Sequence, residues 1–311
     1  MSKPAGRPAP SRAQWLRRLA LRRRDRVAFV FSGGGPLGGL QVGSLKALFE
    51  FGIVPEIAVG SSVGALNATF IAFNPSTGGA DGLERIWLGL TDGDLFPGGR
   101  FKATWARFLV RGNRVFENTG MRKLVESRLG HAHFEDAQIP LGVVATDLET
   151  GDETVFTSGP VAPPLLASTA MPGVFPPVDI EGRHYIDGGV SNNVPISPAV
   201  NMGGKTLYVM DSTSHSHQKR PLNRPIDYML HAFTLARSQR LQIEQKLYSD
   251  KLRVVMLPTP KLDFFVPFAS MEFTERLIEM SYERTRSFLS GGREAVVETP
   301  VSGLEVVAPA K

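Results

Sequence analysis

Two glycine-rich turns, separated by about one strand-helix unit, constrain this chain more than any other feature. The second turn is Gly60-Ser61-Ser62-Val63-Gly64, which follows the apolar run 57–59 and precedes a predicted helix over residues 65–73. A strand that enters a helix through Gly-x-Ser-x-Gly is typical of a nucleophile elbow, because small residues such as Gly60 and Gly64 permit a strained turn around the serine. The pattern therefore predicts that Ser62 is a nucleophile exposed at the edge of a sheet.

The first turn follows the apolar strand predicted at 27–31. Its backbone amides lie at the end of a neighbouring strand, so they can point to the place where an acyl oxygen becomes an anion. We predict an oxyanion hole in this loop, and its candidate donors are Gly33, Gly34, Gly35 and Gly38. The two turns together predict a serine acyl hydrolase.

The same first turn also fits a dinucleotide-binding fingerprint, Gly-x-Gly-x-x-Gly between a strand and a helix over 39–51. That fingerprint needs an acidic residue at the end of the next strand, where it binds a ribose hydroxyl. Here the next strand ends in Gly60-Ser61-Ser62, and the nearest acid, Glu56, precedes the strand. We therefore favour the acyl hydrolase over nucleotide binding.

The chain is long enough to bury a sizeable core. It has 311 residues, 42% of them hydrophobic, and its predicted strands and helices alternate, which is typical of one α/β domain. The lack of cysteine excludes disulfides, a thiol nucleophile and cysteine metal sites. No apolar run approaches the roughly 18 residues of a membrane span, and none follows the first arginines as in a secretory signal. We expect a cytoplasmic or peripheral membrane protein.

Positive charge is concentrated in residues 1–26, which we predict to be a basic arm. The net charge is +5, and the arm contains Arg12, Arg17, Arg18, Arg22, Arg23, Arg24 and Arg26. Interleaved apolar residues would let such a segment contact an anionic membrane. Arg22 and Arg23 interrupt the apolar stripe, so we favour a solvated arm. We expect no nucleic-acid binding, because no nucleic-acid-binding module accompanies the charge.

The rest of the chain continues the α/β pattern. Helices are predicted at residues 83–90, 105–110, 120–129, 163–170, 224–248 and 271–289, and strands at 141–147, 154–157, 205–211 and 253–257. We assign 27–200 to a catalytic core, 201–290 to the C-terminal part of the same domain and 291–311 to a loosely packed tail. We expect the apolar run 264–268 to pack in the core, with an acyl-chain or bilayer contact as the alternative.

A serine hydroxyl needs a base to become a good nucleophile. Asp187 is followed by Gly188 and Gly189, so other backbone can approach its carboxylate closely, and Asn192 and Asn193 can fix the surrounding loop. Asp187 is therefore the predicted base, although an aspartate before glycine is also common in turns.

Other assignments stay open. The chain order of a conventional triad would be Ser62, Asp187 and then His215 or His217. Asp147 ends a predicted strand and is a second carboxylate candidate, which a turn with residues 150–151 would also explain. The paired histidines lack a convincing third ligand, so we predict no metal and no other cofactor.

In these residues the chain resembles the patatin-like phospholipase family. The loop 33–38, the elbow 60–64 and Asp187-Gly188-Gly189 match three family blocks in order, and residues 167–177 resemble the segment before the third block. The resemblance covers residues 27–200. It implies a three-layer α/β/α fold with a mostly parallel central sheet, a Ser62–Asp187 dyad without a catalytic histidine, and a phospholipid or other lipid acyl ester as substrate.

One departure from the family pattern concerns the groups that stabilise the oxyanion. Many members carry a basic residue where this chain has Leu37, so backbone amides must suffice here, with Gly34 and Gly35 as the first candidates. An acyltransferase that uses the same serine remains an alternative. A lipid-binding protein without turnover is a third, which the intact serine, aspartate and glycines argue against.

Overall fold

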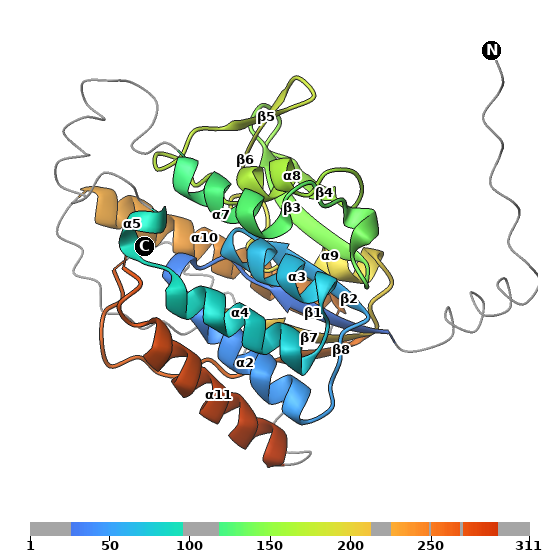
Figure 1. Ribbon diagram of the computed structural model, residues 1–311. Helices are drawn as coiled ribbons and strands as arrows, with labels where there is room; N and C mark the ends of the chain where they lie inside the picture. Colours follow the sequence, from blue (N-terminus) through green and yellow to red (C-terminus); the bar gives the residue numbers. More distant parts are fainter. Residues whose placement is uncertain (1–25, 96–117, 213–224, 249, 268–269, 292–311) are drawn as a thin grey trace, which may run out of the picture.

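The computed structural model describes residues 26–95, 118–212, 225–248, 250–267 and 270–291 (Figure 1). The rest of the basic arm, the helix expected at 105–110, both histidines of the triad alternative and the tail beyond Gly291 lie outside these residues.

An eight-stranded sheet forms the centre of the described chain. Its parallel strands, in spatial order, are β3 (Leu141–Asp147), β2 (Ile57–Ser61), β1 (Val27–Phe31), β7 (Thr206–Met210) and β8 (Arg253–Met256). The antiparallel strands are β4 (Glu153–Phe156) and β6 (Arg183–Asp187), which both pair with β3, and β5 (Val178–Ile180), which pairs with β6. Because β1 and β2 are parallel neighbours, the two glycine-rich turns that follow them emerge side by side at one edge of the sheet.

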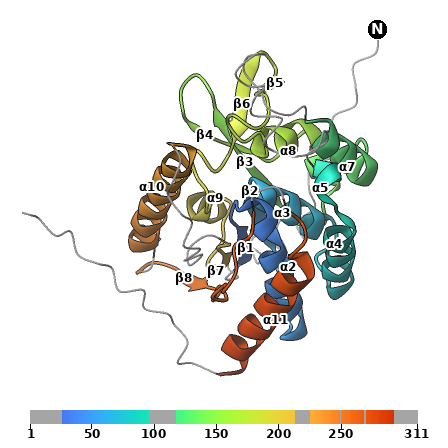
Figure 2. The ribbon, with the colours of Figure 1, turned by 90° about the vertical axis from the view of Figure 1, so that its left-hand side faces the viewer.

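Helices cover both faces of this sheet, as Figure 2 shows. One layer contains α2 (Gly38–Glu50), α3 (Val63–Phe73), α4 (Thr77–Gly89), α7 (Thr119–Leu129), α8 (Ala162–Ser168) and α11 (Thr274–Ser290). The other contains α9 (Ile196–Asn201) and α10 (Pro225–Tyr248). Shorter pieces are α5 (Asp92–Leu95), η1 (Gly35–Leu37) and η2 (Phe134–Asp136).

The strand residues alternate between two buried cores. Phe29 and Phe31 pack against the first layer, while Ala28 and Val30 pack against the second. A strand buried on both faces reads as a continuous apolar run, as β1 does. The predicted three-layer α/β/α fold with a mostly parallel sheet is thus confirmed.

Two local expectations were wrong. The helix expected at 83–90 begins at Thr77, because Ser76 caps it by accepting a hydrogen bond from the Gly79 amide; the glycines of that first turn weaken the helical pattern. Residues 185–187 belong to β6, whereas we expected them in a loop. This strand is short and begins with polar residues, so it shows little of the alternation that identifies a strand in a sequence. No described helix is long and apolar enough to cross a bilayer.

Candidate active site

Ser62 occupies the sharp turn between β2 and α3. Its φ of 55° and ψ of −130° lie in a region that residues other than glycine rarely adopt. Glycines on both sides make the turn possible: a Cβ on Gly60 would lie 2.2 Å from the Gly64 carbonyl oxygen, and one on Gly64 would lie 2.4 Å from that of Phe31. The backbone therefore has the form of a nucleophile elbow and holds Ser62 where β1 and β2 end.

The strand register brings Asp187 to the level of Ser62. In the parallel pair of β2 and β3, Ser61 lies opposite Val144. In the antiparallel pair of β3 and β6, Asp187 lies opposite Ala145, the next residue of β3. Two residues distant in sequence are thus placed on either side of one strand.

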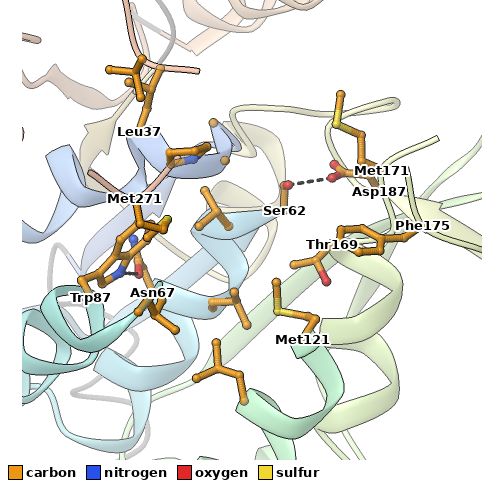
Figure 3. Close-up of a pocket in the computed structure, with 18 of the residues that line it drawn as sticks. Leu37, Ser62, Asn67, Trp87, Met121, Thr169, Met171, Phe175, Asp187 and Met271 are labelled. Atoms are coloured by element: carbon orange, nitrogen blue, oxygen red, sulfur yellow. Dashed lines mark hydrogen bonds between the residues drawn. The ribbon is translucent and has the colours of Figure 1, made fainter. Parts of the chain in front are cut away.

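Ser62 and Asp187 are in direct contact. The Ser62 Oγ donates a hydrogen bond of 2.7 Å to Asp187 Oδ2, drawn as a dashed line in Figure 3. The second carboxylate oxygen, Oδ1, accepts a hydrogen bond of 2.7 Å from the Gly189 amide. A carboxylate held in this way can accept the proton of the serine hydroxyl.

The carboxylate of Asp187 is buried, with 3% of the residue exposed. Burial raises its pKa above the ordinary value of a carboxyl group, because the charged form loses its hydration. The positive charge of Arg237 and the hydrogen bonds from Ser62 and Gly189 oppose this rise. A carboxylate with a raised pKa is a stronger base than an exposed one.

Arg237 reaches the site from α10. Its Nε donates a hydrogen bond of 2.8 Å to the Gly189 carbonyl oxygen, and its guanidinium lies 3.8 Å from the centre of the Phe233 ring. Burial lowers the pKa of Arg237, while the charges of Asp187 and Asp211 raise it. Sequence reasoning missed this residue, because its helical spacing does not distinguish it from the other arginines of α10.

Two of the four candidate amides in the glycine loop already donate hydrogen bonds within the protein. The Gly33 amide donates to the Asn193 carbonyl oxygen at 3.0 Å, and the Gly38 amide donates to the carbonyl oxygen of Gly35. In the part of the chain that the structure describes, no hydrogen bond engages the amides of Gly34 or Gly35, and both residues line the cavity beside Ser62. Gly33 and Gly38 therefore shape the loop, which leaves Gly34 and Gly35 as candidate donors.

A cavity of about 300 Å³ opens next to Ser62 and Asp187. One part of its apolar wall comes from α3, α4 and α7, through Leu66, Phe70, Leu83, Ile86, Trp87, Met121 and Leu124, and from Leu90, which follows α4. Polar or charged side chains also line it, namely Asn67, Thr169, His231, Thr234 and Arg237. This composition suits an apolar ligand that carries one polar, reactive group.

A buried hydrogen-bond network fixes the wall to the glycine loop. Trp87 Nε1 donates to Asn67 Oδ1 at 2.9 Å. The Asn67 side-chain nitrogen, Nδ2, in turn donates to the Gly38 carbonyl oxygen at 3.1 Å and to Gln41 Oε1 at 2.8 Å. On the other side of the elbow, Ser168 Oγ accepts a hydrogen bond of 2.9 Å from the Ser62 amide. Sequence reasoning assigned no role to any of these side chains.

Other residues considered from the sequence lie elsewhere. Asp147 accepts hydrogen bonds from the amides of Glu149 and Thr150, so it closes the turn after β3. His184, which sequence reasoning did not single out, has an exposed side chain beside Asp179. Part of the apolar run 264–268, Phe265 and Val266, lines the cavity, so core packing describes this run incompletely. Among the described residues no three His, Asp or Glu side chains gather in a way that could hold a metal ion.

A serine on a strained strand-to-helix turn, hydrogen-bonded to a buried carboxylate beside an apolar cavity, is typical of hydrolases that use a serine nucleophile. The sequence model of the family described as Patatin-like phospholipase matches residues 29–200. The chain belongs to this family of lipid hydrolases, which confirms the resemblance.

Relatives share the same region. A patatin-like phospholipase domain-containing protein of Caenorhabditis elegans is 30% identical over 213 residues, and patatin-like phospholipase domain-containing protein 7 of Mus musculus is 27% identical over 208 residues. These alignments cover 65% and 66% of this chain but 15% of each relative. The solved structure of VipD from Legionella pneumophila has a TM-score of 0.48 at 13% identity, covering 86% of this chain and 67% of that one.

Proposed function

We propose that this chain hydrolyses lipid acyl esters with Ser62 as nucleophile and Asp187 as base. Family membership supports lipid hydrolysis. The observation that carries the assignment of residues is the 2.7 Å hydrogen bond from Ser62 Oγ to Asp187 Oδ2. That direct contact supports a dyad over a triad, because a triad places an imidazole between serine and carboxylate.

The proposed reaction has two halves. Ser62 gives its proton to Asp187 Oδ2 while its Oγ attacks the ester carbonyl carbon, and the amides of Gly34 and Gly35 stabilise the resulting oxyanion. The ester bond then breaks, the leaving alcohol takes the proton from Asp187, and an acyl-Ser62 remains. In the second half Asp187 takes a proton from water, the hydroxide attacks the acyl group, and the proton returns to Ser62 as the fatty acid leaves.

The cavity supports an acyl chain as the bound group. Its apolar wall along α3, α4 and α7 can remove methylene groups from water, each worth about 0.8 kcal/mol. Filling this wall should shorten the preferred chain. We expect Leu124→Trp to favour shorter acyl esters, whereas Leu88→Trp, at an exposed position of α4 outside the cavity lining, should keep the chain-length preference. An unchanged preference in both variants would place the acyl chain elsewhere.

The decisive test of the activity is product analysis. Purified protein should release free fatty acid from phospholipid vesicles, and Ser62→Ala should release none above background. Adding an alcohol acceptor separates the two enzyme classes: a hydrolase still yields mainly fatty acid, while an acyltransferase yields mainly the new ester. Vesicles left intact by the wild-type protein, or equal release by both proteins, would contradict the proposal.

A further inference from the structure

We propose that Arg237 of α10 is a positioning residue of this site, which fixes the turn after Asp187 and places a positive charge beside that turn. This inference rests on the proposed function, because it assumes that Asp187 acts as the base. Arg237 lies outside residues 29–200, the part of the chain that the family model matches.

Gly189 links the guanidinium to the carboxylate. Its carbonyl oxygen accepts the 2.8 Å hydrogen bond from Arg237 Nε, and its amide donates the 2.7 Å hydrogen bond to Asp187 Oδ1. The guanidinium packs so closely on this turn that a Cβ on Gly189 would lie 2.5 Å from Arg237 Nη2. A shift of Arg237 would therefore be transmitted through one residue to the base.

The structure holds Arg237 in this place in two ways. One turn earlier on α10, the Phe233 ring lies under the guanidinium, and the face of an aromatic ring attracts a cation. Two turns later, Glu244 is buried and accepts hydrogen bonds from the Asn192 side chain at 3.1 Å and from the Ser197 amide at 3.0 Å. These contacts tie α10 to the chain that follows Gly189.

A buried carboxylate needs a compensating charge to remain ionised. Among the described residues, Arg237 is the cation whose charge acts on Asp187. The glycine loop provides none, because residues 33–38 contain no basic side chain and Leu37 lines the cavity. Asp211 at the end of β7 also attracts the guanidinium, and His231 is a further titratable group in the cavity wall. Loss of the arginine charge should therefore favour the protonated, inactive form of Asp187.

The test is the pH dependence of kcat/KM for an uncharged, soluble short-chain ester. Arg237→Gln should shift the acid limb upward by about one pH unit or more, the scale of removing a neighbouring opposite charge. Arg237→Lys should keep the limb close to wild type. Arg240→Gln is the matched control on the same helix, because Arg240 pairs with Glu153 and Glu244 instead of Asp187. It should leave the limb in place even where it lowers the melting temperature.

Two results would overturn the inference. One is an acid limb in Arg237→Gln that coincides with that of the wild type. The other is a loss confined to KM for phospholipids, which would make Arg237 a phosphate-binding residue of the substrate site. If Arg237→Gln does not fold, the pH dependence of fluorophosphonate labelling in Arg237→Lys and Arg237→His decides. The acid limb of the labelling rate should lie at higher pH in the histidine variant, because an imidazole loses its charge near neutral pH and an ammonium does not. Activity in Asp187→Asn would instead refute the proposed function itself.

Discussion

Replacing Ser62 by glycine should give a more stable protein than replacing it by alanine. At φ 55° and ψ −130°, any residue with a Cβ is strained. Such strain costs about 1–3 kcal/mol. Glycine relieves it, but glycine loses about 0.5–1 kcal/mol more conformational entropy than alanine when the chain folds. Both variants lose the hydroxyl and its hydrogen bond to Asp187, so those contributions cancel, and the glycine variant should be more stable by about 1 kcal/mol.

Thermal unfolding of the two variants measures this difference, which corresponds to about 2–4 °C in Tm. Ser61 provides the control, because it is the last residue of β2 and has an ordinary backbone conformation. There the order should reverse, and Ser61→Gly should be less stable than Ser61→Ala by about 0.5–1 kcal/mol. A Ser62→Gly protein that unfolds at or below the temperature of Ser62→Ala would show that the elbow is not strained.

Three further predictions concern the base, the oxyanion loop and the arm. Because burial raises the pKa of Asp187 and only its ionised form is a base, kcat/KM should fall as pH drops through a pKa above the ordinary carboxyl range; a midpoint within that range contradicts the burial argument. When a phosphonate is attached to Ser62, the amide protons of Gly34 and Gly35 should shift downfield in NMR spectra while that of Gly33 stays in place, and the reverse pattern would move the oxyanion hole. Deleting residues 1–24 should leave binding to anionic vesicles and hydrolysis of a soluble ester unchanged, as for a solvated arm; a salt-sensitive loss of binding would show membrane contact.

Local patterns predicted the central part of the fold well. The continuous apolar run of β1, the Gly-x-Ser-x-Gly turn and the hairpin of β3 and β4 each depend on residues close together in sequence. Near neighbours decide such elements, so spacing alone indicates them. The long helix α10 was also expected at nearly its observed bounds.

The site was predictable only where its residues lie in such patterns. The elbow identified Ser62, and the glycines after Asp187 identified a carboxylate, but their contact depends on the pairing of β6 with β3. Arg237, Ser168 and the Asn67–Trp87 pair act through tertiary contacts that no spacing rule encodes. The difference between Gly34 and Gly33 as amide donors likewise depends on a contact with Asn193, far along the chain.

The most direct test of the central claim is covalent labelling with a fluorophosphonate, mapped by peptide mass spectrometry and paired with turnover measurements. The wild-type protein should carry one adduct, on Ser62. Folded Ser62→Ala should carry none and lose at least about a thousandfold in turnover, as expected on removing a nucleophile. Asp187→Asn should keep Ser62 in place but label it far more slowly. An adduct on another residue, or a Ser62→Ala protein that retains turnover, would contradict the account.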